Sequence, residues 1–288
     1  MLSDSEELTL QKLDIQGAQT LLEWAGNEGW NPGKQDYEVF WKTDPDGFYG
    51  FYHNDRLIAG GSVVCYGGQY GFMGLFIVHP EFRGHGIGKK LWFLRRDLLL
   101  SRLKEGASIG MDGVVEMQPF YAEGGFEIAF KDERYERSGE SLTFSDLISP
   151  IQDLDFNLVR GYDTRYFGYE RSSFLRNWLT LSKSKSFKYL RGDILKGFAV
   201  IREVKNGFKI GPLFADDAEI AEELYKACLN HAPGMPVYLD IPLRNQEAVN
   251  LVKKYGATYV FECARMYYGK EPHVNWNNVF GITTFELG

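Results

Sequence analysis

The stretch GFMGLFIVHPEFRGHGIGKKLWFLRRDLLLSRLKEG, residues 71–106, contains the clearest folding signal of the chain. Its first part, 72–78, is a continuous apolar run rich in Phe, Ile and Val that Pro80 closes, which predicts a buried strand. The apolar positions that follow recur at helical spacing: Ile87, Leu91, Leu94 and Leu98, widened by Trp92, Leu99 and Leu103. This spacing predicts a helix with one buried face that ends at Gly106.

Three glycines lie between the predicted strand and the predicted helix, in the turn Arg83-Gly84-His85-Gly86-Ile87-Gly88-Lys89. Glycines let backbone N–H groups approach a phosphate closely, and a helix N-terminus adds partial positive charge. A Walker A loop would need glycine at Arg83, and a dinucleotide fingerprint that starts at Gly84 would need glycine at Lys89. The turn therefore predicts an anion site of another kind.

The pattern Val78-x-Pro80-x-x-Arg83-Gly84-x-Gly86-Ile87-Gly88 resembles the acyl-CoA pyrophosphate loop of the GNAT acetyltransferase superfamily, which follows Gln/Arg-x-x-Gly-x-Gly/Ala. The resemblance implies acetyl-CoA as cosubstrate and no metal. It also implies that the backbone of 76–78 holds the pantetheine arm and that the amides of the turn hold the pyrophosphate. The implied cofactor-binding residues are Phe76, Ile77, Val78, Arg83, Gly84, His85, Gly86, Ile87, Gly88 and Lys89.

Length and composition indicate a soluble globular protein of about two domains, because the chain has 288 residues, 44% of them apolar and 25% charged. The net charge of −7 argues against nucleic acid as a partner. Cys65, Cys228 and Cys263 have no paired or metal-like spacing, so we expect reduced thiols. The acidic start, 1–7, and the lack of a long apolar run predict no secretion signal, no membrane contact and a cytoplasmic location.

The expected elements occur twice in the same order, which predicts a tandem repeat. We expect a first unit over 1–137 whose last strand is 128–135, a polar linker over 138–155, and a second unit over 156–288 with its last strand at 259–268. The resemblance covers nearly all of the first unit. The predicted fold class is α/β (α+β), with a GNAT-like mixed sheet flanked by helices in each unit.

The second unit lacks the chemistry of the first. At the matching helix start, the segment Gly211-Pro212-Leu213-Phe214-Ala215-Asp216-Asp217-Ala218-Glu219 places three carboxylates where the first unit has glycines. Carboxylates there would cap the helix and repel a pyrophosphate. Val252 stands where the resemblance would place a catalytic tyrosine. We therefore expect a degenerate, non-catalytic second unit that binds no acetyl-CoA.

Two residues are the predicted catalytic pair. Tyr121 begins Tyr121-Ala122-Glu123-Gly124-Gly125-Phe126, which resembles the superfamily's Tyr-x-x-x-Gly-Phe and implies a proton donor to the leaving thiolate; a tyrosine packed under the sheet is the alternative. The strand over 71–75 lacks the glutamate that many relatives carry. Asp112 is therefore the predicted base, because a carboxyl within an apolar strand has a raised pKa. Glu116 and His79 are the next candidates. A structural acid bonded to backbone N–H groups is the alternative.

Three aromatic residues are the predicted acceptor-lining set, by resemblance to folds in which the connection between the first two helices borders the acceptor pocket: Trp30, Phe40 and Trp41. Ordinary core aromatics are the alternative for them.

The function predicted from the sequence is direct transfer of an acetyl group from acetyl-CoA to a primary amine of a small molecule. A non-catalytic acyl-CoA-binding protein and an aminoacyl transferase that uses aminoacyl-tRNA are the two rivals. Neither the acceptor nor the oligomeric state follows from the sequence.

Overall fold

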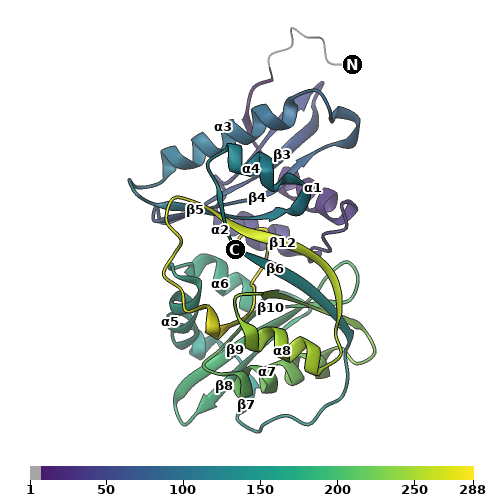
Figure 1. Ribbon diagram of the computed structural model, residues 1–288, viewed down its shortest axis with the longest axis vertical. Coiled ribbons are helices and arrows are strands. Elements are labelled where there is room, and N and C mark those ends of the chain that lie inside the picture. Colours follow the sequence, from purple (N-terminus) through teal and green to yellow (C-terminus); the bar gives the residue numbers. More distant parts are fainter. Residues whose placement is uncertain (1–7) are drawn as a thin grey trace.

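The structure is a computed structural model that describes residues 8–288, so the acidic start at 1–7 lies outside the described residues. Its first half contains β1 (Gln11–Lys12), α1 (Ile15–Asn27), α2 (Asp36–Thr43), β2 (Phe48–His53), β3 (Arg56–Tyr66), β4 (Tyr70–Val78), α3 (Ile87–Arg102), β5 (Ser108–Val114), α4 (Gln118–Glu123) and β6 (Glu127–Ser138). These elements have the predicted order, and Figure 1 shows them as the purple-to-teal half of the molecule.

The second half repeats this order of elements. It contains β7 (Ile148–Pro150), α5 (Phe156–Phe167), α6 (Ser172–Leu179), β8 (Ser184–Arg191), β9 (Ile194–Glu203), β10 (Phe208–Ala215), α7 (Ala218–His231), β11 (Pro236–Pro242), α8 (Gln246–Lys254), β12 (Thr258–Tyr268) and β13 (Val279–Gly281). The segment expected as a linker, 138–155, includes β7, which pairs with β8 at the far edge of the sheet. The architecture is a mixed α/β fold with helices flanking the sheet.

The two halves exchange their last strands and so form one continuous sheet. Its order is β1-β2-β3-β4-β5-β12-β6-β11-β10-β9-β8-β7. β12 takes the place beside β5, whereas β6 pairs with β12 on one side and β11 on the other. The strand predicted over 128–135 is present as β6, but it lies between β12 and β11 and not beside β5. Strand periodicity indicates which residues face the core but not which strand becomes the neighbour.

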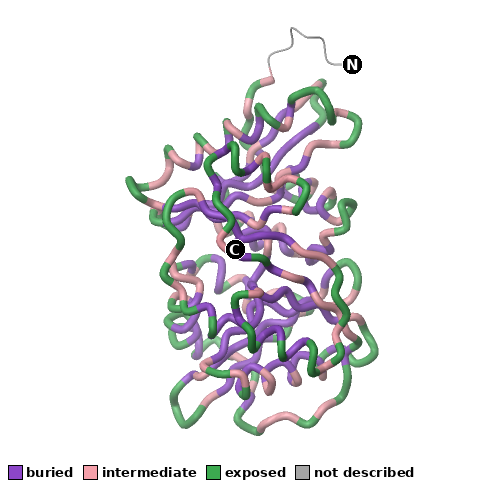
Figure 2. The backbone as a smooth tube through the Cα atoms, in the orientation of Figure 1, coloured by how far each residue is buried: buried purple, intermediate pink, exposed green. Residues whose placement is uncertain are grey.

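The core lies on both faces of the sheet, and Figure 2 shows the strands largely buried with exposed residues concentrated on loops and outer helix faces. On α3 the buried positions include Leu91, Trp92 and Leu99, but Leu94 is 38% exposed and Arg95 takes its place. The Arg95 guanidinium fits against Gly61, where a Cβ would lie 2.3 Å from Cζ. It donates to the carbonyl oxygens of Ser62 and Gly74, so a charged residue occupies the predicted apolar stripe.

The chain does not end at the last predicted strand. After Tyr268 it returns towards the middle of the molecule, where β13 pairs with β10, and Figure 1 places the C label between the two halves. The Ile282 amide donates to the Asp240 carbonyl over 2.8 Å, and the Tyr66 hydroxyl donates to the Leu287 carbonyl over 2.9 Å. The C-terminal tail, residues 282–288, thus contacts both halves.

The described helices are too short or too polar to serve as membrane spans. The three cysteines are free thiols; Cys228 and Cys263 are buried.

Candidate active site

A cavity of about 650 Å³ opens where β4 and β5 separate. The two strands pair in parallel only from Tyr70 to Phe72 on β4. Beyond that point Leu75 adopts a φ of 49°, and the register with β3 shifts. Phe76, Ile77 and Val78 line the cavity, so this part of β4 borders open space where a neighbouring strand would otherwise lie. Peptide groups on such a free edge can hydrogen-bond an extended ligand.

One end of the cavity is the N-terminus of α3. Gly86 is its N-cap in the left-handed region, with a φ of 75°, and no side chain caps the helix. A Cβ at Gly84 or Gly86 would meet no atom within 4 Å, so the turn is open to solvent. The first amides of α3 therefore have no side-chain acceptor, which is the condition for binding an anion.

The predicted loop residues divide into two groups. Arg83, Gly84, Gly88 and Lys89 line the cavity. His85, Gly86 and Ile87 complete the turn: the His85 side chain is exposed, and the Ile87 side chain is buried in the core below the helix. Arg83 fixes the turn to the strand, because its Nε donates to the Val78 carbonyl over 2.9 Å and its guanidinium pairs with Glu28.

Tyr121 lies on α4 across the cavity from β4. Its ring centroid is 4.7 Å from that of Trp92 and 6.5 Å from that of Phe76, and Gly113 leaves room for the ring. Burial raises the pKa of Tyr121 well above its usual value. The phenol therefore stays protonated at neutral pH and can donate a hydrogen bond or a proton.

Asp112 is held by an ion pair rather than left free. Its two oxygens accept from Arg265 Nε over 2.7 Å and from Arg265 Nη2 over 2.9 Å. Burial raises the pKa of Asp112, and the Arg265 guanidinium offsets part of that rise. The residue lines the cavity, but its side chain has no exposed surface. An amine in the cavity therefore does not meet this carboxylate.

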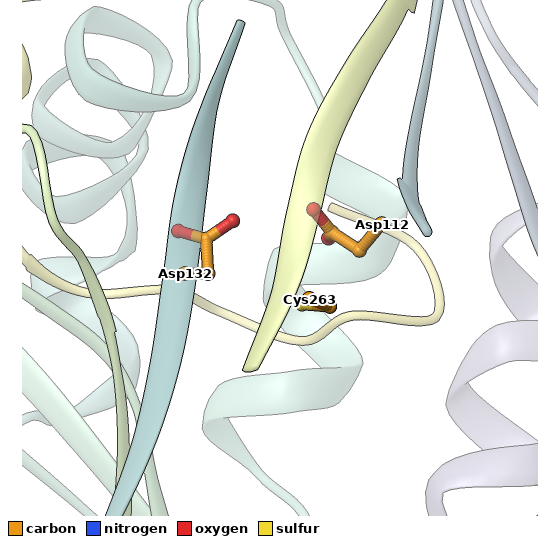
Figure 3. A group of neighbouring side chains, drawn as sticks. All are labelled: Asp112, Asp132 and Cys263. Atoms are coloured by element: carbon orange, nitrogen blue, oxygen red, sulfur yellow. The ribbon is translucent and has the colours of Figure 1, made fainter. Parts of the chain in front are cut away.

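Asp112 also belongs to a cluster with Asp132 and Cys263, on three adjacent strands (Figure 3). Their ligand atoms lie within 4.8 Å of one another, and neither Asp132 oxygen has a partner among residues 8–288. Burial and the nearby Asp112 raise the pKa of Asp132 well above its usual value. These pKa directions favour the neutral form of Asp132 beside an Asp112 that Arg265 holds, and a metal ion would have to compete with Arg265 for Asp112.

The other end of the cavity is aromatic and includes residues of both halves. The Arg134 guanidinium lies 4.8 Å from the Phe261 ring and 5.5 Å from the Phe285 ring. Its Nη2 donates to Asp240 over 2.7 Å and its Nη1 donates to the Trp30 carbonyl over 2.8 Å. Trp30, from the connection between α1 and α2, also lines the cavity, and its contact with the acceptor stays a prediction.

The other two predicted acceptor residues lie elsewhere. Phe40 is fully buried and stacks on Trp178, with ring centroids 6.2 Å apart. Trp41 packs on Phe48 at 5.9 Å. Neither lines this cavity, so the prediction that they contact the acceptor is not supported by their placement. They point from α2 into the core that joins the two halves.

Four cavity residues come from the second half and were not predicted: Phe261, Cys263, Phe285 and Glu286. They lie more than a hundred residues from β4 along the chain, and no local pattern connects them with it. One signal was present, namely Gly74 in the middle of a strand, because an interior strand glycine often marks the close approach of another backbone. A Cβ at Gly74 would lie 2.0 Å from the Glu286 carbonyl oxygen.

Two family models match the chain, one in each half. The model described as Acetyltransferase (GNAT) family matches residues 15–126, and the model described as Acetyltransferase (GNAT) domain matches residues 159–281.

Relatives match along the whole chain. It is 30% identical to the holothin acyltransferase of Pseudoalteromonas sp. (strain SANK 73390), an alignment that covers 100% of this chain and 97% of that protein. It is 21% identical to the uncharacterised N-acetyltransferase YitH of Bacillus subtilis (strain 168), with 97% and 98% covered.

Solved structures agree with the fold. A protein from Pyrococcus horikoshii, itself assigned only provisionally as an acetyltransferase, superposes with a TM-score of 0.84 at 20% identity, covering 100% of this chain and 99% of that one. A tandem GNAT protein from the clavulanic acid biosynthesis pathway gives a TM-score of 0.64 at 12% identity, covering 92% and 99%.

Proposed function

The chain belongs to the GNAT acetyltransferase family, and from this premise we propose that it transfers an acetyl group from acetyl-CoA directly to a primary amine of a small molecule. The observation that carries the proposal is one continuous cavity. It runs from the uncapped start of α3, along the free edge of β4, to Tyr121 and an aromatic end.

In this proposal the first half binds the cosubstrate. The amides from Gly84 to Lys89 hold the pyrophosphate, with Arg83 and Lys89 adding positive charge beside it. The pantetheine arm extends along 78–76, which brings the thioester to the bulge at Leu75.

The chemistry then needs two proton transfers. The amine nitrogen attacks the thioester carbon, the C–S bond breaks, and an N–C bond forms in its place. Tyr121 donates its phenolic proton to the leaving thiolate, a role that suits a hydroxyl kept protonated by burial. The amine loses one proton to a base.

The acceptor site is the aromatic end around Trp30, Arg134 and Phe285. Aromatic walls favour a flat, apolar acceptor body with the amine directed towards β4. One relative is named for acylation of holothin. Holothin is therefore the first acceptor to test.

The experiment is a screen of holothin and a panel of primary amines with acetyl-CoA and longer acyl-CoA thioesters, followed by free thiol release and by mass spectrometry of the acylated product. We expect turnover that depends on both substrates. An absence of thiol release with every amine, together with tight acetyl-CoA binding, would instead support a non-catalytic acyl-CoA-binding protein.

A further inference from the structure

The part of β4 that lines the cavity carries no group that could take the amine's proton. From Gly71 to Leu75 the strand has no ionisable side chain. Asp112, on the facing strand, has both oxygens bound by Arg265 and no exposed side-chain surface. Acyl transfer to an amine nevertheless requires a proton acceptor within hydrogen-bond reach of the nitrogen.

The C-terminal tail brings a carboxylate to this position. The tail lies directly on β4 and β10 because each strand has a glycine below it. A Cβ at Gly74 would be 2.0 Å from the Glu286 carbonyl oxygen, and a Cβ at Gly211 would be 2.3 Å from the Thr283 carbonyl oxygen. Neither Gly74 nor Gly211 has a positive φ, so backbone conformation does not explain why these positions are glycine. The close approach of the tail does.

Hydrogen bonds on both sides of Glu286 fix the tail. Arg171 Nη2 donates to the Thr283 hydroxyl over 2.9 Å, and the Tyr66 hydroxyl donates to the Leu287 carbonyl over 2.9 Å. The Gly288 amide donates to the Thr284 carbonyl over 3.1 Å, which closes a turn around Glu286. The carboxylate is therefore positioned by a rigid segment, as a catalytic group requires.

Glu286 lines the cavity, and the residue is only 4% exposed. One carboxylate oxygen accepts from the Thr284 hydroxyl. Among the described residues, no Lys or Arg lies within 4.0 Å of it, in contrast to Asp112. The charged groups that face it are Arg134 on β6, Lys209 on β10 and Asp112 on β5.

We propose that Glu286 is the general base that takes the proton from the acceptor amine, an inference that rests on the proposed acyl transfer. The proposal rests on the order of groups along β4. The pyrophosphate binds beyond Val78, the pantetheine arm lies along 78–76, and Glu286 lies at Gly74, just past the thioester. The amine nitrogen forms the N–C bond and gives its proton to the Glu286 carboxylate. The thiolate leaves with the electrons of the C–S bond and takes the Tyr121 proton.

The test is Glu286→Gln, which removes the charge but keeps the shape and an oxygen for the Thr284 hydroxyl. We expect kcat to fall by about 10²–10⁴-fold, the usual contribution of general base catalysis, while acetyl-CoA still raises the melting temperature as in the wild type. The ratio of wild-type to variant rates should fall towards one as the pH is lowered, because protonated Glu286 cannot act as a base. Ionisation of the amine cancels in this ratio.

Glu262→Gln is the matched control, because it makes the same change on the face of β12 opposite to the cavity-lining Cys263. There Glu262 pairs with Lys131 over 2.8 Å. Its rate should equal that of the wild type. Glu286→Asp keeps the charge and should retain the pH dependence at a reduced rate, which separates a chemical role from a structural one.

Wild-type turnover in Glu286→Gln, or a rate ratio that does not change with pH, would overturn the base assignment and leave the acyltransferase intact. If the wild-type protein releases no thiol with any amine or with water, the proposed function itself is wrong, and so is the base assignment that rests on it.

Discussion

The two halves start an equivalent helix in opposite ways. α3 begins at Gly86 in a left-handed conformation without a side-chain cap, and its first amides face the cavity. α7 begins at Asp217, whose carboxylate accepts from the Ile220 amide over 2.9 Å, as the sequence predicted. Asp216 beside it accepts from the Tyr162 hydroxyl and from Lys196. A helix N-terminus can bind an anion through its unpaired amides, and a capping aspartate occupies one of them and adds negative charge.

The largest effect is expected where the first half is made more like the second. Gly86→Val places a branched side chain where backbone must meet phosphate. Wild-type protein at about 100 times the Kd of acetyl-CoA should gain about 2.7 kcal/mol of stability, and the variant should lose that gain. Thermal melting with and without acetyl-CoA measures it.

Gly106→Val is the matched control, because Gly106 has a φ of 78° and open space around it at the other end of α3. It carries the same backbone strain without the ligand contact. Normal acetyl-CoA binding by Gly86→Val would mean that the pyrophosphate lies elsewhere.

The second comparison is between Tyr121 on α4 and Val252 on α8, a fully buried residue at the matching position. Tyr121→Phe removes only the hydroxyl, so kcat should fall by about 10²–10⁴-fold with little change in acetyl-CoA affinity. Steady-state rates and the ligand-induced shift in melting temperature separate the two effects.

Tyr225→Phe serves as the control, since burial also raises the pKa of Tyr225 but the residue lies on α7, away from the cavity. Equal rates for Tyr121→Phe and wild type would make Tyr121 a core residue, as its packing on Trp92 alone would permit.

The third comparison concerns β5, β12 and β6, the adjacent strands at which the two halves exchange their last strands. Asp132→Asn replaces a buried carboxyl, which has no hydrogen-bond partner among the described residues, by an amide that can donate to Asp112, and it should stabilise the protein by about 1–3 kcal/mol at neutral pH. Unfolded Asp132 ionises above about pH 4, whereas the raised pKa of folded Asp132 makes it hold its proton to higher pH, so its contribution to stability falls as the pH rises.

The melting-temperature difference between Asp132→Asn and wild type should therefore grow from about pH 4 to neutrality, because the unfolded wild type releases a proton that the folded protein retains. Asp153→Asn, at an exposed acid, is the control. A difference that stays constant with pH would show that the folded state ionises Asp132 normally.

Local features could be predicted from the sequence because their causes are local. The strand at 72–78 and the start of α3 followed from apolar runs and glycines only a few residues apart, and Asp217 was recognisable as a cap from its position. Tyr121 came from a short motif, and the structure brings it to the same cavity as the loop.

The other site features depend on contacts between distant segments. Arg265 reaches Asp112 only because β12 replaces β6 beside β5, and no periodicity in either strand encodes that exchange. Glu286 meets Gly74 across more than two hundred residues. Phe40 and Trp41 are aromatic, as an acceptor wall would be, but Phe40 packs against Trp178 of α6 and Trp41 packs against Phe48 of β2.

The smallest effect is expected from making the second half more like the first. Asp217→Ala removes the cap of α7, which should cost about 1 kcal/mol of stability. It should not create a second acetyl-CoA site, because the substitution frees one amide while the start of α7 still lacks glycines and keeps Asp216, whose negative charge opposes a pyrophosphate. Calorimetric titration of both proteins should therefore give one acetyl-CoA per chain. A stoichiometry near two in the wild type would show that the capped helix start binds after all. A second site that appears only in Asp217→Ala would show that the cap alone had closed it, and that the rest of the second half has the shape of a CoA site.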